Sequence, residues 1–251
     1  NTSVTQEMTI FYSKGNENKV EQIYQNGIAL TILNISIFVL IALCFYLFFT
    51  FFDKTGLNFS ILGDLSRHEV NTIVLLIFLA SLINIFNNVF VSGINFQGKL
   101  FVTTNISYIF ELISKTAIIL LGLLFKNLIY IAILFFVLTI CKSFIYSYYF
   151  SKHNKYLRLS LKKVSLKIIL KLFKLSTGHT LEAIHHLIKH HGLVVLIGIF
   201  FNAHMIAYIT TAKTLFYYFP FRVLNAFQNI TVFEYAYLFG KKNFSKIKNY
   251  H

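Results

Sequence analysis

Long apolar runs, separated by short polar segments, make up most of the chain. A helix that crosses a membrane needs about 20 predominantly apolar residues in succession. Six runs have this character, and each predicts one spanning helix: residues 27–52, 70–97, 106–125, 128–150, 177–201 and 203–233. The last run contains the only proline of the sequence, Pro220. Because proline removes a backbone donor and crowds the preceding turn, we expect this helix to bend there.

Composition supports the same class of protein. Hydrophobic residues make up 56% of the 251 residues and charged residues only 13%, about half the charged share of a soluble domain. So few charges cannot cover a soluble core evenly, and the apolar excess excludes a disordered protein. A nucleic-acid-binding protein would explain the net charge of +14 but not the apolar content, so we expect no nucleic-acid partner. The sequence predicts an all-α integral membrane protein with about six transmembrane helices.

The distribution of lysine and arginine predicts the orientation of the chain. Cytoplasmic loops carry an excess of these residues. With the N-terminus in the cytoplasm, the outside loops hold only Lys54, Arg67 and Lys126, whereas most of the 23 basic residues fall in inside segments. The pattern therefore predicts a multi-pass protein of the plasma membrane, with both ends of this chain in the cytoplasm.

A basic segment follows the fourth run. On a helical wheel over residues 157–175, Lys163, Lys167, Lys171 and Lys174 share one face, and apolar side chains cover much of the rest. Such a helix is expected to lie in the cytoplasmic interface of the membrane, with its lysines near anionic lipid headgroups. The alternative is a basic loop that only orients the neighbouring spans.

An internal repeat relates the two ends of the sequence. Residues 7–24 align with residues 234–251, and Glu, Lys, Asn and Lys recur at an offset of 227. The identical pairs are Glu7 and Glu234, Lys14 and Lys241, Asn16 and Asn243, and Lys19 and Lys246. A repeat with an even number of spans keeps its orientation, which predicts parallel six-helix lobes related by an axis along the membrane normal.

The repeat predicts that the chain is an internal segment of a longer protein. It divides the chain into three parts. Residues 1–150 would contain a cytoplasmic loop and the last four spans of a first lobe. Residues 151–175 would form the basic, amphipathic connector, and residues 176–251 the first two spans of a second lobe and a cytoplasmic tail.

Three segments resemble a known family of transporters. They are FYSKGNENKVEQIYQNGIAL at residues 11–30, SLINIFNNVFVSGINFQGKLF at residues 81–101, and STGHTLEAIHHLIKHHGLVVLIGIFFNAHMIAYITTAKTLFYYFP at residues 176–220. With this pattern the chain is similar to helices three to eight of the polysaccharide (O-antigen, Wzx-type) flippases of the multidrug/oligosaccharidyl-lipid/polysaccharide exporter superfamily. The resemblance implies two six-helix lobes around a central cavity. His190 and His191 stand where family members often carry an acidic residue, which alters the local charge.

The resemblance also implies a function. A flippase of this family moves an undecaprenyl-pyrophosphate-linked oligosaccharide across the bacterial inner membrane by alternating access; it is not an enzyme and uses no cofactor. Glycan-assembly proteins are further expected partners. One alternative is a cation-coupled multidrug exporter of the same superfamily, which would need acidic residues in its cavity. A second is a membrane enzyme of glycan assembly, although the sequence contains no nucleotide-binding or metalloprotease motif.

Charged side chains inside the predicted spans are the candidate site residues. A charge at the bilayer centre costs about 2.5–3.5 kcal/mol on insertion scales, so such residues normally face protein or water. The arginine guanidinium binds phosphate oxygens with two parallel hydrogen bonds, which makes Arg222 the first candidate. The predicted pyrophosphate-binding residues are Arg222, Lys189, Lys115 and His186, and the candidate ion-coupling residues are Glu111 and Glu182.

The charged candidates have structural alternatives. Arg222 can pair with Glu234 or with a backbone carbonyl. Glu111 and Lys115 are four residues apart, so they can pair within their own helix.

The fifth run carries a polar stripe with three interpretations. His179, Glu182, His186, Lys189 and His190 fall on one face of a helix, which favours a cavity lining. The same residues can be solvated first turns at the membrane interface. Glutamate and histidine spaced by four can also bind a divalent metal ion, but the sequence shows no pattern of residues that would hold such ligands in place by hydrogen bonds, and we predict no metal.

The second run carries neutral polar residues on one face: Ser81, Asn84, Asn87 and Asn88. Asparagine in a span commonly holds helices together by hydrogen bonds, which is the favoured interpretation. Contact with sugar hydroxyls is the other.

Overall fold

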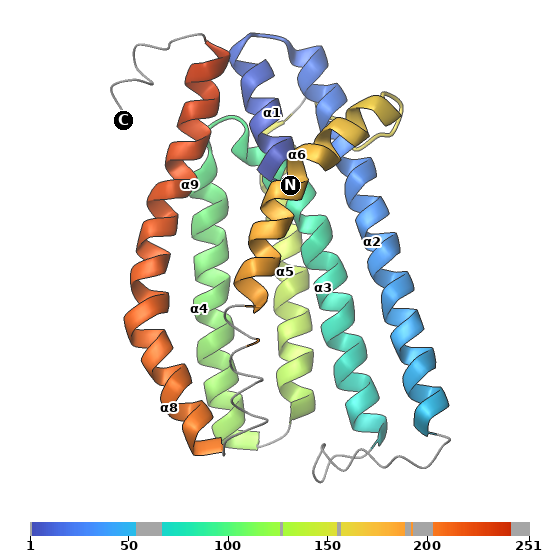
Figure 1. Ribbon diagram of the computed structural model, residues 1–251, viewed down its shortest axis with the longest axis vertical. Coiled ribbons are helices and arrows are strands. Elements are labelled where there is room, and N and C mark those ends of the chain that lie inside the picture. Colours follow the sequence, from blue (N-terminus) through green and yellow to red (C-terminus); the bar gives the residue numbers. More distant parts are fainter. Residues whose placement is uncertain are drawn as a thin grey trace. The chain divides into compact units, whose positions relative to one another are not determined.

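The long apolar runs of the sequence form long helices. The computed structural model describes residues 2–53, 67–125, 128–154, 157–188, 192 and 203–241, and within these ranges the chain is helical, with turns and no strand. The elements are α1 (Thr2–Ser13), α2 (Glu17–Asp53), α3 (Arg67–Asn95), α4 (Leu100–Phe125), α5 (Leu128–His153), α6 (Leu166–Leu187), α8 (Ala203–Lys213), the π-helix η3 (Thr214–Tyr218) and α9 (Phe219–Gly240) (Figure 1). The all-α class is confirmed.

Four of these helices are long and apolar enough to cross a membrane, by length and composition. The stretches of that kind are Glu17–Phe48, His68–Asn95, Leu100–Gly122 and Leu128–His153, which correspond to the first four predicted spans. Large apolar side chains such as Leu112, Leu124 and Phe144 are exposed on them. Soluble proteins rarely expose large contiguous apolar surface, so this arrangement is compatible with a membrane protein.

The structure covers the last two predicted spans in part. Helix α6 joins the basic connector to the first turns of the span predicted at 177–201, and residues 193–202 lie outside the described residues. The run at 203–233 forms α8, η3 and most of α9. Six spans, and the two lobes they would form, stay a prediction.

Helix geometry changes next to Pro220. The five residues of η3 are π-helical and end two residues before the proline. Proline has no N–H to donate to the carbonyl four residues earlier, and its ring crowds that turn. A π-turn is one of the ways in which a helix accommodates such a disruption. The irregularity expected at this proline is present, and α8, η3 and α9 follow one bowed path (Figure 1).

The chain forms two compact units. The middle unit is Tyr24–Val164, and the terminal unit combines Asn1–Ile23 with Ser165–His251. The segment before the first span, expected to be a loop, is helical: it forms α1, which packs against α9 and α6 in the terminal unit. The predicted division at residues 150 and 175 grouped residues 1–23 with the first four spans, whereas in the structure they belong to the terminal unit. The assignment of the units to lobes stays a prediction.

The ends of α1 and α9 approach each other closely within the terminal unit. Helix α1 ends at Ser13 and α9 ends at Gly240, and the 227-residue offset makes these two positions equivalent. A Cβ atom on Gly240 would collide with Ser13 and with the carbonyl of Ile10, so glycine permits the approach. The repeat itself stays a prediction.

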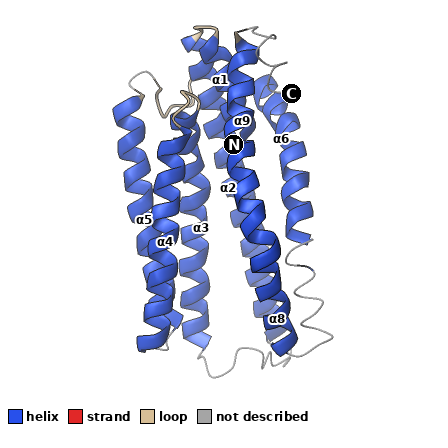
Figure 2. Cartoon of the chain, turned by 90° about the vertical axis from the view of Figure 1, so that its left-hand side faces the viewer, coloured by secondary structure: helices blue, strands red, loops and turns tan. Residues whose placement is uncertain are grey.

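Aromatic side chains form the core of the middle unit at one end of its helices. Helices α3, α4 and α5 lie side by side (Figure 2). The ring of Phe150 lies 5.6 Å from the rings of both Tyr24 and Phe90. Gly93 of α3 leaves room for this ring. The stack joins α2, α3 and α5 where α5 leads into the connector.

Buried amides fix the connector to the middle unit. The Asn154 amide donates to the Gly93 carbonyl. Further along the chain, the Lys163 N–H donates to Gln25 Oε1 at 2.8 Å, and Asn26 Nδ2 donates to the Lys163 carbonyl at 3.2 Å. Gln25 and Asn26 belong to α2, and their side chains are buried. Together they bind both the N–H and the carbonyl of Lys163.

The helix expected to start at residue 157 begins only at Leu166, after Ser165. That part of the prediction is wrong, because the side chains of α2 bind the backbone of Lys163 and take the place of helical partners. Lys163 therefore does not belong to the lysine face of α6.

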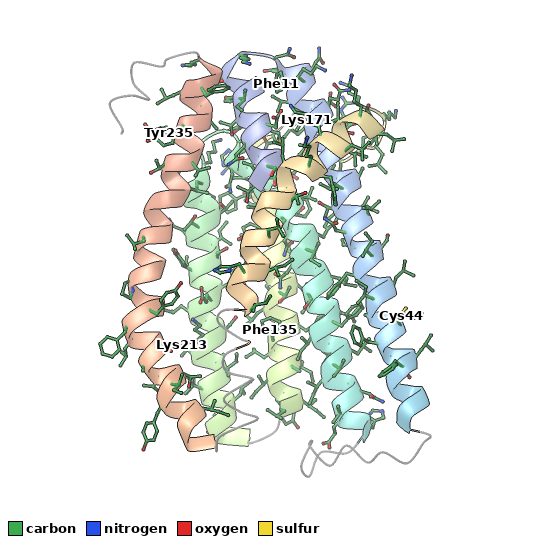
Figure 3. The ribbon with its side chains drawn as sticks, viewed as in Figure 1. Phe11, Cys44, Phe135, Lys171, Lys213 and Tyr235 are labelled. Carbon is green, nitrogen blue, oxygen red and sulfur yellow. The ribbon has the colours of Figure 1, made fainter. Side chains whose placement is uncertain are left out.

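The lysine face of α6 consists of Lys167, Lys171 and Lys174, all exposed. Lys171 Nζ lies 2.8 Å from Glu7 Oε2 on α1 (Figure 3). One lysine of this face thus has a protein partner, and the other two remain the candidates for contact with anionic lipid.

Replacing Asn26 by Leu is expected to destabilise the protein. Asn26 is fully buried, and the change removes the donor to the Lys163 carbonyl. A buried polar group left without its partner costs about 1–3 kcal/mol. Asn34→Leu is the matched control, because Asn34 lies on the same helix with an exposed side chain. Thermal unfolding in detergent should show a lower midpoint for Asn26→Leu than for Asn34→Leu, and equal midpoints would contradict the role of the amide.

Candidate functional site

Polar side chains gather between α3, α4 and α5 of the middle unit. They line two adjoining cavities of about 510 and 500 Å³, which share Asn84, Ser107 and Lys142. We call the two cavities together the polar groove. Polar groups within a span normally face protein or water, because exposing them to lipid is costly. The polar groove is therefore the candidate site of the described residues.

The charges of the polar groove come from α4 and α5. Lys115 Nζ lies 2.6 Å from Glu111 Oε1, so the predicted pairing within the helix is confirmed. Glu111 also attracts Lys142 of α5 electrostatically. The Lys142 ammonium lies 5.6 Å from the ring centroid of Tyr146. Two lysines and one carboxylate line this part of the groove, which gives it a net positive charge.

Hydroxyl groups connect the three helices along the groove. Tyr146 Oη and Ser107 Oγ are 2.7 Å apart, and Tyr146 Oη also donates to the Thr103 carbonyl at 3.3 Å. Thr103 Oγ1 donates to Asn95 Oδ1 at 2.6 Å. These contacts join α4 to α5 and α4 to α3, so one wall of the groove has fixed hydrogen-bonding partners.

The asparagines of α3 behave differently from the favoured expectation. Asn84, Asn87 and Asn88 line the groove, and their side chains form no hydrogen bond with any other residue that the structure describes. Asn87 is 3% exposed, and within the described ranges neither its amide nitrogen nor its amide oxygen has a hydrogen-bond partner. In the described part of the chain, Asn95 makes the hydrogen bond between helices that was expected of these three.

The predicted pyrophosphate-binding residues fall in different parts of the chain. Lys115 lines the polar groove of the middle unit. Arg222 lies on α9 and His186 on α6, both in the terminal unit, and their side chains are outside the described structure. Lys189 lies outside the described residues altogether. Of the four side chains, the structure describes that of Lys115, and a shared site for the four stays a prediction.

The described structure includes only some of the residues in the ion-coupling and metal hypotheses. Glu111 lines the groove, whereas the side chain of Glu182 on α6 is outside the described structure. Within the side chains that are described, no three of His, Cys, Asp or Glu form a group that could hold a metal ion. The candidate metal ligands are Glu182, His186 and His190, and their side chains are outside the described structure.

Sequence reasoning missed Lys142 and Tyr146 as groove residues. The signal was available, because Thr139, Lys142 and Tyr146 are spaced by three and four on α5 and therefore share one face. The spacing does not show which helices pack against that face. Only the packing of α5 against α3 and α4 identifies it.

Replacing Glu111 by Gln is expected to reduce insertion of the protein into the membrane. Glu111 and Lys115 flank the midpoint of α4, and an unpaired lysine at the centre of a span costs about 2.5–3.5 kcal/mol. Adding Lys115→Met to Glu111→Gln should recover most of the loss, since the pair is then neutral. Immunoblots of the membrane fraction measure both variants, and an equal loss in the single and double variants would contradict the pairing.

Comparison with protein-family models, with curated proteins and with solved structures finds no match to this chain. The assignment to a family therefore rests on the residues quoted from the sequence and stays a prediction. The fold itself is an all-helical chain whose described residues include four helices able to cross a membrane.

Proposed function

We propose that this chain forms part of a flippase that moves an undecaprenyl-pyrophosphate-linked oligosaccharide across the bacterial inner membrane. The observation that carries the proposal is the polar groove, a space that polar and apolar side chains line between helices of membrane length. A lipid-linked glycan requires such a space, because its tail can stay in lipid while its pyrophosphate and sugars must pass the apolar core. The resemblance to polysaccharide flippases suggests the same cargo.

The charge of the groove suits an anionic cargo. Lys115 and Lys142 outnumber Glu111 there, and a phosphate group is attracted to ammonium groups more strongly inside a membrane than in water. The proposed route of the pyrophosphate begins at the cytoplasmic side, where the basic segments of the chain are expected.

Arg222 is the proposed principal ligand of the pyrophosphate, with Lys189, Lys115 and His186 as further contacts. A guanidinium fits two phosphate oxygens at once, which a lysine ammonium cannot do. When the pyrophosphate leaves water it loses its hydration, and fixed cations that bind it would replace those interactions. The protein then changes between inward-open and outward-open forms, as alternating access requires.

The driving force has two proposed sources. The membrane potential is worth about 2.3 kcal/mol per charge per 100 mV, and its inside-negative sign favours outward movement of an anion. Glu111 and Glu182 are the proposed sites at which a proton or another cation would couple to transport. Neither source requires an enzymatic step or a cofactor.

The surroundings of the protein follow from the same proposal. The plasma membrane of a bacterium would contain it, with both ends of this chain in the cytoplasm. Lys167 and Lys174 of α6 would contact anionic lipid headgroups at the cytoplasmic surface. Enzymes that assemble the glycan are the proposed protein partners.

A cation-coupled multidrug exporter is the rival in the same superfamily. Its substrates are commonly cations, so its cavity would benefit from surplus carboxylate. The polar groove has the opposite balance, with two lysines and one glutamate. A glycan-assembly enzyme is the second rival and would need a pair of acid–base residues, whereas the described lining of the groove contains one carboxylate, that of Glu111.

Deleting the gene in its host tests the proposal against both rivals. A flippase defect should remove surface polysaccharide while the completed lipid-linked glycan accumulates in the membrane. An exporter defect should raise drug sensitivity and leave the polysaccharide intact. An enzyme defect should leave the lipid-linked glycan unfinished. Either of the last two results would overturn the proposed function, and re-expression of the gene controls for effects on its neighbours.

A further inference from the structure

An unpartnered amide lies inside the polar groove. Asn87 is 3% exposed and lines the cavity of about 510 Å³, and neither its amide nitrogen nor its amide oxygen has a hydrogen-bond partner among the described residues. Leaving buried polar groups unpaired costs about 1–3 kcal/mol each, and folded proteins contain few of them. A partner supplied from outside the protein would remove this cost.

The part of the groove near Asn87 is rich in amide and hydroxyl groups, which donate and accept hydrogen bonds, and Lys142 also lines it. Asn84, Asn87 and Asn88 are spaced by three and four residues, so they lie on one face of α3. Each amide offers two donor hydrogens and an acceptor oxygen. Hydroxyl groups of Thr103 and Ser107 line the opposite side, on α4.

The chemistry of this part of the groove selects a class of ligand. A metal cation would prefer carboxylates, but among the residues that the structure describes the only charged one lining this cavity is Lys142. An apolar ligand would leave the amides unpaired. A sugar ring fits, because each of its hydroxyls donates and accepts a hydrogen bond, as each amide does. The cavity volume of about 510 Å³ also lies within the about 300–1,000 Å³ of small-molecule sites.

We propose that the amide-lined part of the polar groove binds a sugar residue of the transported glycan, with Asn87 as its central hydrogen-bonding residue. The inference rests on the proposed function for the identity of the cargo and adds a binding site for its sugar. Lys115, which lines the other part of the groove, and Lys142, which lines both parts, would lie toward the pyrophosphate, so the groove would contact both parts of the cargo.

Two probes separate sugar binding from pyrophosphate binding. The complete protein in lipid nanodiscs is titrated with the undecaprenyl-pyrophosphate-linked glycan extracted from the host, and separately with undecaprenyl pyrophosphate that carries no sugar. For Asn87→Leu, which keeps the approximate volume of the side chain, we expect at least tenfold weaker binding of the glycan-bearing lipid. Binding of the sugar-free lipid should not change.

Two further variants control for misfolding and for effects that any Asn-to-Leu replacement has on lipid binding. Asn88→Leu changes an exposed asparagine of the same face, so its fold is not at risk, and it should weaken only the glycan-bearing lipid by several-fold. Asn105→Leu, on an exposed position of α4 outside the groove, should bind both lipids as the wild type does.

The outcomes distinguish the two levels of the proposal. Equal binding of the glycan-bearing lipid by the wild type and by both groove variants would overturn the sugar site while leaving the proposed function intact, as would an equal loss for both lipids. A wild-type protein that binds neither lipid would contradict the proposed function, and the sugar site with it.

Discussion

Replacing Arg222 by Ala in the complete protein is expected to abolish surface polysaccharide while the amount of protein in the membrane stays the same. Arg222 lies on α9, two residues after Pro220 and beyond the π-turn of η3. Under the proposed function its guanidinium binds two oxygens of the pyrophosphate, and no other residue type supplies that geometry. Quantification of surface polysaccharide beside an immunoblot of the membrane fraction measures both quantities.

Two matched variants test whether geometry or charge matters at this position. Arg222→Lys keeps the charge but loses the two-pronged contact, so it should restore only part of the polysaccharide. Lys213→Ala removes a basic residue of α8 that has no assigned role, and it should leave the polysaccharide at the wild-type level. Normal polysaccharide in Arg222→Ala would rule out the proposed role.

Replacing Gly93 by Val is expected to prevent normal folding of the middle unit. A Cβ at this position would overlap the ring of Phe150, which is stacked on the ring of Tyr24 and also packs against the ring of Phe90. Overpacking a core costs about 1–3 kcal/mol for small additions, and valine adds more than one carbon. The Gly93 carbonyl also accepts a hydrogen bond from Asn154, so displacement of α3 would release the connector.

Gly122 provides the control on α4, because a Cβ there meets no atom within 4 Å. Gly122→Ala should leave the unfolding midpoint unchanged or slightly higher, since alanine favours helix over glycine. Size-exclusion profiles in detergent should show a single peak for Gly122→Ala and aggregated protein for Gly93→Val. A monodisperse, thermally unchanged Gly93→Val protein would contradict the described core.

The long helices were predictable from sequence, because a run of apolar residues is a local property. Helices α2, α4 and α5 each contain a predicted run, and α3 covers the run at 70–97 except for its last two residues. Their boundaries were less predictable: α2 begins at Glu17, well before its apolar run, since its polar first turns contain the buried Val20 and Ile23. Helix α1 was missed for a related reason, because its packing against α9 involves residues more than 200 positions away.

The candidate site was predictable where partners are close in sequence. The pairing of Glu111 with Lys115 follows from their spacing on one helix, and the structure has it. The capture of the Lys163 backbone by Gln25 and Asn26 joins residues about 140 positions apart, and no local pattern indicates it. Asn87 belongs to a third class, because its spacing predicted a shared face but not the absence of a partner on the neighbouring helices.

Transport of the lipid-linked glycan by the purified protein tests the central claim most directly. Proteoliposomes are prepared with the complete protein and the undecaprenyl-pyrophosphate-linked glycan, and a membrane-impermeant oxidant of sugar diols is added outside. Protein-free vesicles should protect the glycan of the inner leaflet. Vesicles with the wild-type protein should lose that protection over time, and vesicles with Arg222→Ala should keep it. Protection that persists with the wild-type protein, while the same vesicles transport a cationic drug, would contradict the flippase account.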